Sequence, residues 1–242
     1  MLPTLDLGPV ALPTAGLVYI LGIWLALTVV ERSAARLALN VPVTYNLAAL
    51  GLAVGVIAAR LAFVARYWDA YRQNLVGIVW PLTSGFSLLP GLIAGLAAAF
   101  FYARAKRLPA WPTLDALVPA LLVALLAISL ADFLAGPGFG ERADLLWSID
   151  LFGVRRHPVQ IYEIVVGLVA LLAWRRAVHS QRLPGQAALM ALAVYSAGRL
   201  FVDAYRANVS LTADGYHVVQ IASLGILLAS LGLLARRATT AD

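Results

Sequence analysis

Cysteine is absent from the 242-residue chain, and lysine occurs only once, as Lys106. Without cysteine the chain has no disulfide, no thiolate nucleophile and no thiolate metal site. Charged residues are also scarce, at 12% against about 25% in soluble domains. What remains is apolar: 62% of the residues are hydrophobic, and the mean hydropathy is +0.86. This composition indicates a polytopic membrane protein.

Several signatures of soluble enzymes are missing as well. The chain has no P-loop, no Gly-x-Ser-x-Gly elbow and no His-Glu-x-x-His. Its three histidines, His157, His179 and His217, lack the spacing of metal ligands, so we expect no metal and no cofactor. The net charge of +6 contains no long basic block, so we interpret it as a signal of membrane topology and expect no nucleic-acid partner.

Seven apolar runs each approach the length of about 20 residues that spans a bilayer as a helix. They cover residues 13–30, 47–65, 86–103, 114–134, 158–174, 187–205 and 218–235. We therefore predict an all-α, multi-pass protein with one transmembrane domain over residues 1–242. The third run begins among Gly85, Pro90 and Gly91, which predicts a broken or re-entrant start.

Basic residues give the orientation of these runs. Ten of the eighteen lysines and arginines follow odd-numbered runs. The positive-inside rule then places the N-terminus outside and the C-terminus in the cytoplasm. A polar loop over residues 136–157 is expected at the outer face.

Polar side chains crowd residues 155–163, where this loop enters the fifth run. Pro158 suits the first turn of a helix, because its missing N–H loses no partner there. A helix N-terminus flanked by cations attracts an anion such as phosphate. The alternative is a helix cap with solvated charges, and spacing alone does not separate the two. The candidate residues of this stretch are Arg156, His157, Gln160, Tyr162 and Glu163.

Two arginines lie within apolar runs, Arg60 in the second and Arg199 in the sixth. An arginine near the bilayer centre costs about 2.5–3.5 kcal/mol to insert, so it is usually paired and directed inward. Asp203 follows Arg199 by one turn, which favours a local ion pair. The alternative is an anion site that combines both arginines with residues 155–163, since a guanidinium fork suits phosphate.

Two further polar residues lie at the ends of runs. Gln220 shares a face of the seventh run with Ser223. We expect Gln220 to line the cavity of this anion site or to form a hydrogen bond across helices. Asp115 is interpreted as part of the start of the fourth run. Neither residue alone indicates a function.

The segment from His157 to Glu163 resembles the His-Pro-x-Gln-x-Tyr-Glu signature of the bacterial prolipoprotein diacylglyceryl transferase family. Further segments resemble that family in the same order, at residues 14–17, 58–61, 87–95, 199–206 and 220–223. The resemblance implies a seven-helix protein of the bacterial plasma (inner) membrane. It also implies transfer of a diacylglyceryl group from phosphatidylglycerol to the cysteine of a prolipoprotein signal peptide, with a thioether formed and glycerol phosphate released.

This reaction needs cations for the leaving phosphate and a base for the thiol. On the resemblance we expect His157, Arg199 and Asp203 to be catalytic. The expected substrate-binding residues are Arg60, Arg156, Gln160, Tyr162, Glu163, Arg206 and Gln220.

The chain departs from the family pattern at three places. Leu89 stands in place of a histidine, Ser129 in place of an arginine and Asp132 in place of an asparagine. These departures motivate an alternative, a homologue that binds phospholipid or a membrane partner without transfer. A third possibility is a transporter or channel that uses the same arginines for an anionic metabolite.

Overall fold

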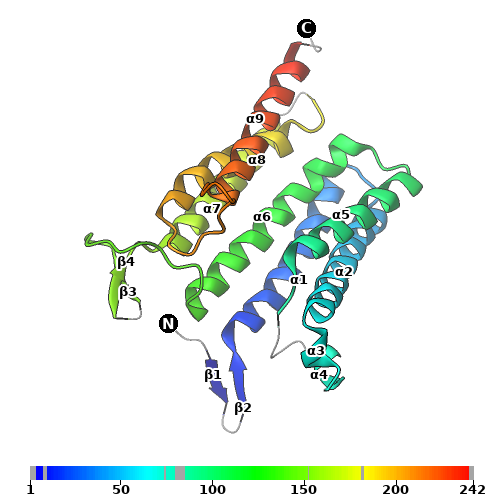
Figure 1. The fold of residues 1–242 in the computed structure, drawn as a ribbon. Helices are drawn as coiled ribbons and strands as arrows, with labels where there is room; N and C mark the ends of the chain where they lie inside the picture. Colours follow the sequence, from blue (N-terminus) through cyan, green and yellow to red (C-terminus); the bar gives the residue numbers. More distant parts are fainter. Residues whose placement is uncertain are drawn as a thin grey trace. The chain divides into compact units, whose positions relative to one another are not determined.

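The computed structural model describes residues 4–7, 10–73, 75–79, 85–151, 153–180 and 183–239. Long helices dominate this part of the chain (Figure 1). They are α1 (Thr14–Arg36), α2 (Val41–Arg66), α5 (Leu88–Ala105), α6 (Ala110–Ala135), α7 (Val159–Ser180), α8 (Gln186–Val202) and α9 (Val218–Thr239). The shorter pieces are α3 (Trp68–Tyr71), α4 (Val76–Val79) and the 3-10 turn η2 (Asp203–Tyr205).

Every predicted apolar run lies on a helix, so the helical, multi-pass class is confirmed. Six of the helices are long and apolar enough to cross a membrane, namely α1, α2, α5, α6, α8 together with η2, and α9. The predicted number was seven. The fifth run corresponds to α7, which has 22 residues. Glu163, Arg175 and Arg176 shorten the apolar stretch of this helix, so it is not one of the six. Within the described residues α5 has no break, because Pro90 falls in its first turn, where proline is tolerated.

The helices belong to two compact units, residues 34–113 and residues 1–33 with 114–242. The predicted single domain over residues 1–242 stays a prediction. In the first unit, α2 begins behind Asn40, whose side chain accepts a 3.1 Å hydrogen bond from the Val43 N–H. This cap explains why α2 starts before the predicted residue 47.

Glycines set the close packing of α2 against α5. A Cβ atom on Gly95 would lie 2.7 Å from the Gly51 carbonyl oxygen, and one on Gly91 would lie 2.7 Å from the Gly55 carbonyl oxygen. Any larger residue would therefore push the helices apart. Pairs of small residues four positions apart are typical of membrane helices whose backbones touch.

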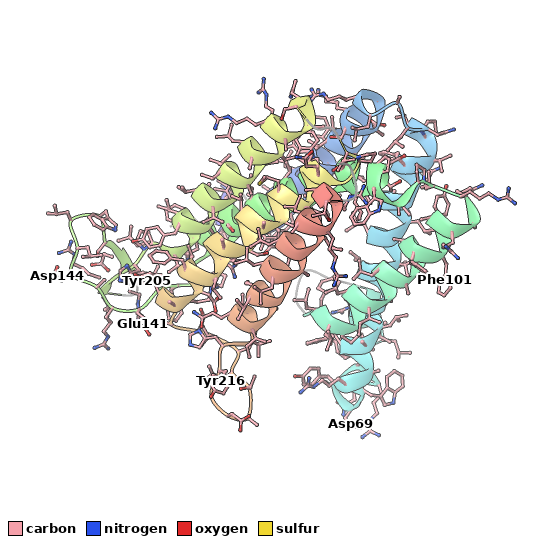
Figure 2. The ribbon with its side chains drawn as sticks, turned by 90° about the horizontal axis from the view of Figure 1, so that it is seen from above. Asp69, Phe101, Glu141, Asp144, Tyr205 and Tyr216 are labelled. Atoms are coloured by element: carbon pink, nitrogen blue, oxygen red, sulfur yellow. The ribbon has the colours of Figure 1, made fainter. Side chains whose placement is uncertain are left out.

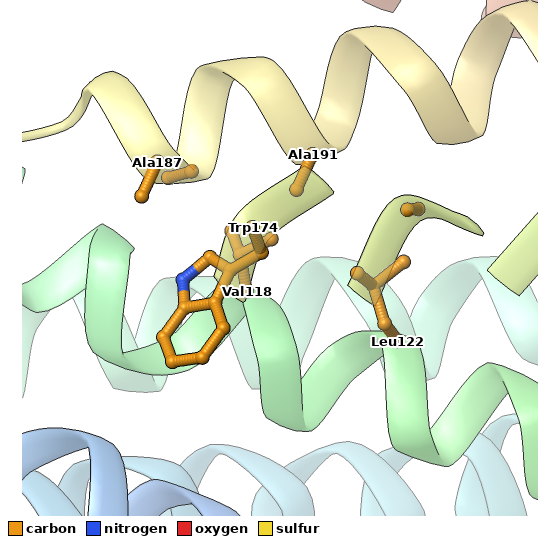
Figure 3. Packing of buried hydrophobic residues seen from close by; sticks show 7 residues of the cluster. Val118, Leu122, Trp174, Ala187 and Ala191 are labelled. Carbon is orange, nitrogen blue, oxygen red and sulfur yellow. The ribbon is translucent and has the colours of Figure 1, made fainter. Parts of the chain in front are cut away.

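In the larger unit the buried apolar core joins α6, α7 and α8 (Figure 3). Trp174 of α7 lies against alanines of α8, and its Nε1–H donates a 2.9 Å hydrogen bond to the Asp115 carbonyl oxygen. Asp115 lies near the start of α6, as we interpreted it. Its carboxylate also accepts from the backbone N–H groups of Gly185 and Ala188, at 2.5 and 2.7 Å, and so caps α8.

Two short hairpins, which we did not predict, accompany the helices. One pairs β1 (Thr4–Leu7) with β2 (Val10–Pro13), and the other pairs β3 (Ile149–Leu151) with β4 (Val154–Arg156), both antiparallel. The second lies in the predicted polar loop. Strands of three or four residues carry too few positions for a clear alternation of polar and apolar side chains, which is why the pattern is missing.

Candidate active site

A buried carboxylate, Glu163, lies one turn inside α7 and is only 5% exposed. Its Oε1 accepts hydrogen bonds from Nη1 of Arg199 and Nη2 of Arg206. Its Oε2 accepts a 2.9 Å hydrogen bond from the Ser129 hydroxyl of α6. Glu163 therefore joins side chains from α6, from α8 and from the segment after η2.

Asp203 extends this arrangement with longer contacts to the same two guanidinium groups. Its side chain is 1% exposed, and Oδ1 lies 3.7 Å from Nη2 of Arg199 and 3.8 Å from Nε of Arg206. Its Oδ2 lies 3.3 Å from Nδ1 of His217. We call Glu163, Arg199, Asp203 and Arg206 the charge cluster.

The charge cluster is expensive to bury and must be held together. Both arginines are only 14% exposed, and removing one partner of a buried ion pair costs about 3–5 kcal/mol. The local Arg199–Asp203 pair that we predicted is present, but it is the longer of the two contacts of Arg199. The anion site that we gave as the alternative for Arg199 stays a prediction.

The predicted polar loop is held beside the charge cluster by backbone hydrogen bonds. Glu141 N–H donates to the Tyr205 carbonyl at 2.8 Å, and the Glu141 carbonyl accepts from His157 N–H at 3.0 Å. Figure 2 shows Tyr205 and Glu141 at the same end of α7 and α8. The loop therefore connects the segment after η2 to the start of α7.

Gly138 lies where this loop touches the charge cluster. Its φ of +71° favours glycine. A Cβ atom there would lie 2.8 Å from Nη1 of Arg206 and 3.2 Å from Oδ2 of Asp132. Both the backbone conformation and the lack of space therefore exclude a side chain at position 138, and the loop backbone lies close to the Arg206 guanidinium.

His157, a predicted catalytic residue, has aromatic partners. Its Nδ1 lies 3.3 Å from the Tyr162 hydroxyl, which accepts a 2.8 Å hydrogen bond from Nε1 of Trp147. The ring centroids of His157 and Tyr205 are 4.8 Å apart. Tyr162 is thus brought next to His157, as the signature suggests. Pro158 directly precedes α7, which starts at Val159.

Arg156 and Gln160 carry buried polar atoms that have no hydrogen-bond partner in the described part of the chain. For Arg156 this atom is Nε, while Nη1 donates to the Gly140 carbonyl at 3.2 Å and the guanidinium lies 4.6 Å from the Phe139 ring centroid. For Gln160 it is Oε1, while Nε2 donates to the Pro137 carbonyl at 2.9 Å. Buried atoms of this kind are suited to a ligand.

The remaining predicted residues, Gln220 and Arg60, donate hydrogen bonds to backbone carbonyl oxygens. Gln220 donates to the Leu200 carbonyl at 3.2 Å, so it bonds across helices. Arg60 belongs to the unit of residues 34–113. It donates from Nε to the Ile78 carbonyl at 2.9 Å, from Nη1 to the Gly85 carbonyl at 3.0 Å, and from Nη2 to the Gly77 carbonyl. Within that unit Arg60 therefore binds α4 and Gly85.

Sequence reasoning missed two members of the site. Ser129 attracted attention only as a departure from a family pattern, yet its hydroxyl binds Glu163. His217 was considered only as a metal ligand, yet its Nδ1 lies 3.3 Å from Oδ2 of Asp203. No local signal could have found His217, because its partner lies 14 residues earlier in another element.

The chemistry available here is anion recognition together with proton transfer. Each guanidinium has five N–H donors, and each donates only one hydrogen bond to Glu163. Nε of Arg206 is buried without a hydrogen-bond partner among the described residues. The charge cluster thus presents fixed cations with unused donors, which suits a phosphate group. Among the described residues no group of acidic or histidine side chains could hold a metal ion.

Comparison with known proteins gives a consistent result. The profile of the prolipoprotein diacylglyceryl transferase family matches residues 3–236. Three similar proteins are each named phosphatidylglycerol–prolipoprotein diacylglyceryl transferase. The Synechococcus elongatus protein is 30% identical, over 96% of this chain and 86% of its own length. Those of Clostridioides difficile (27% identical, 86% and 84%) and Bacillus cytotoxicus (26%, 97% and 92%) are comparable.

Proposed function

Because the chain belongs to the prolipoprotein diacylglyceryl transferase family, we propose that it transfers a diacylglyceryl group from phosphatidylglycerol to the lipobox cysteine of a prolipoprotein. The cysteine sulfur attacks a glyceryl carbon, a thioether forms, and glycerol phosphate leaves. The acceptor supplies the thiol, which is consistent with a chain that has no cysteine.

The observation that carries this proposal is the buried charge cluster. A leaving phosphate needs positive charge that is already in place, because fixed donors need no reorganisation during the reaction. Glu163 holds Arg199 and Arg206 against a common oxygen. In our proposal their remaining N–H donors bind the phosphate, and Asp203 balances part of their positive charge.

The other predicted residues have supporting roles in this proposal. Arg156 and Gln160, with their unbonded buried atoms, bind polar groups of the lipid. Tyr162 orients His157. Gln220 fixes the start of α9 against α8. Arg60 contributes to substrate binding in its own unit, where it binds α4 and Gly85.

The proposed topology follows from the same site. We take α7 as a seventh span, with Glu163 neutralised by its two arginines, since a paired charge costs less within a membrane. The protein is then a multi-pass protein of the bacterial plasma membrane, with the N-terminus outside and the C-terminus in the cytoplasm. Its partners are phosphatidylglycerol and the prolipoprotein signal peptide.

The test is a transfer assay in membranes that contain labelled phosphatidylglycerol and a lipobox peptide. Wild-type protein should form the thioether, and Arg199→Gln should lower the rate about 10²–10³-fold, as expected for loss of one preorganised charge contact. Arg72→Gln is the matched control, because Arg72 forms an exposed pair with Asp69. Equal rates for Arg199→Gln and the control would contradict the proposal.

One observation favours a second function, phospholipid binding without transfer. Ser129 stands where the family signature has an arginine, and its hydroxyl supplies a hydrogen bond to Glu163 but no charge. Phosphatidylglycerol that copurifies with the wild-type protein and is not consumed when the lipobox peptide is added would favour this function. Thioether formation by the purified protein would exclude it.

A further inference from the structure

His217 lies directly before α9 and faces the charge cluster. Its Nδ1 is 3.3 Å from Oδ2 of Asp203, which is 1% exposed, whereas the His217 side chain is 28% exposed. The backbone around it is fixed: the Ile221 N–H donates to the His217 carbonyl at 3.1 Å, and Leu211 forms a bridge with His217. Figure 2 shows Tyr216, the preceding residue, on the loop that leads into α9.

This geometry prepares an imidazole to accept a proton. A carboxylate next to Nδ1 keeps the proton of the neutral ring on that nitrogen and leaves the Nε2 lone pair free. Among the described residues the only side-chain contact of His217 involves Nδ1. Asp203 in turn is held between Arg199 and Arg206. The orientation of the ring is thereby tied to the arginines that we assign to phosphate.

We propose that His217 is the general base that takes the proton of the acceptor cysteine thiol, with Asp203 as its positioning residue. The proposal rests on the proposed transferase function. The S–H proton moves to Nε2, and the sulfur electron pair forms the C–S bond. The bond between the glyceryl carbon and the phosphate oxygen breaks, and its electron pair leaves with glycerol phosphate. Loss of the proton from the imidazolium to the phosphate or to water restores the base.

The other two histidines are less suited to this task. Nδ1 of His157 faces the hydroxyl of Tyr162, which is a weaker orienting group than a carboxylate. His179 lies in the last turn of α7, where its Nδ1 is 2.6 Å from the Arg175 carbonyl. His217 alone among the three is paired with a buried carboxylate in the described part of the chain.

Among the described residues, Asp203 is the charged side chain that contacts the His217 ring. Asp203 faces it from η2, and behind that carboxylate lie the two arginines of the charge cluster. On its own loop Asp214 and Tyr216 are exposed. The first charged side chains of α9 are Arg236 and Arg237, in its last turn. A protonated His217 cannot accept the thiol proton, so we expect kcat/KM to decline at acidic pH.

The test compares kcat/KM of the wild type, His217→Ala and His179→Ala in the transfer assay between about pH 5 and 8, the range in which histidine usually titrates. We expect His217→Ala to lower kcat/KM about 10²-fold, as general-base catalysis typically contributes, and to remove the decline of the rate at acidic pH. Added imidazole should restore part of the rate, which also shows that the variant is folded. His179→Ala should match the wild type.

Two results would overturn the proposal. One is a His217→Ala variant that transfers at the wild-type rate with an unchanged pH profile. The other is a slow variant that imidazole does not restore and whose rate still declines at acidic pH. Failure of the transferase function is separate, because it would appear in the wild-type measurement as the absence of any thioether, and the role of His217 as the base would fall with it.

Discussion

Replacing Glu163 by glutamine should destabilise the protein through charge alone. Glutamine has nearly the same volume, so it leaves no cavity. Its amide oxygen can accept from Arg199 and Arg206, and its NH₂ group can donate to Ser129, so the three hydrogen bonds can be kept. What is lost is the negative charge between two guanidinium groups that are each 14% exposed.

The size of the effect follows from the neighbours of Glu163. Removing one partner of a buried ion pair costs about 3–5 kcal/mol. Asp203 lies 3.7 and 3.8 Å from the same guanidinium groups and balances part of their charge. We therefore take the lower end, about 3 kcal/mol. For a chain of this length, 1 kcal/mol moves the melting temperature by about 2–4 °C, so Glu163→Gln should melt about 6–12 °C below the wild type.

The assay is thermal unfolding of the purified protein in one detergent, followed by circular dichroism at the helix band. Glu141→Gln is the control, because Glu141 is exposed and binds its neighbours through backbone atoms. It should stay within about 0.5 kcal/mol of the wild type, as surface substitutions usually do. If Glu163→Gln melted together with Glu141→Gln, Glu163 would not hold the two arginines as we describe.

Two further predictions concern the unit of residues 34–113, and the same thermal assay tests both. Gly95→Leu should cost about 1–3 kcal/mol, because its Cβ would lie 2.7 Å from the Gly51 carbonyl oxygen, whereas Gly225→Leu has open space and should cost little. Arg60→Lys keeps the charge but cannot reach three carbonyls with one nitrogen. If each lost charged hydrogen bond is worth about 1.5 kcal/mol, it should cost about 3 kcal/mol, and the exposed Arg66→Lys close to zero. If Gly95→Leu melted at the same temperature as Gly225→Leu, the close packing of α2 against α5 would be contradicted. If Arg60→Lys melted at the same temperature as Arg66→Lys, the three hydrogen bonds of Arg60 would be contradicted.

The helices could be predicted because the bilayer sets one length for every span. Their ends could not, since local capping decides them: Asn40 moves the start of α2 to Val41, and α7 continues to Ser180. The β3–β4 hairpin was also beyond prediction. Its neighbours in space include the segment around Arg142, which forms a bridge with Arg156, and such contacts leave no periodic pattern in the sequence.

The site was predictable as far as its contacts are local. Spacing of four residues was enough to pair Arg199 with Asp203. The closer partner, Glu163, comes from α7 and lies 36 residues away, so it depends on the register of α7 against α8. The family signature placed Glu163 among the binding residues. Only packing shows that its first role is to hold the two arginines.

The contacts of Glu163 also bear on whether the transfer reaction can proceed with Ser129 in place of the family's arginine. The four residues of the charge cluster carry no net formal charge, Asp132 adds a negative charge near Arg206, and an arginine at position 129 would add a positive charge. When His217 takes the thiol proton, it becomes a cation 3.3 Å from Asp203. The charge cluster and His217 together then gain one positive charge at the step in which the phosphate leaves. On this argument the protonated His217 supplies the positive charge that an arginine at position 129 would have provided. We therefore expect His217 to contribute more to the transfer rate in this chain than it would beside a third arginine.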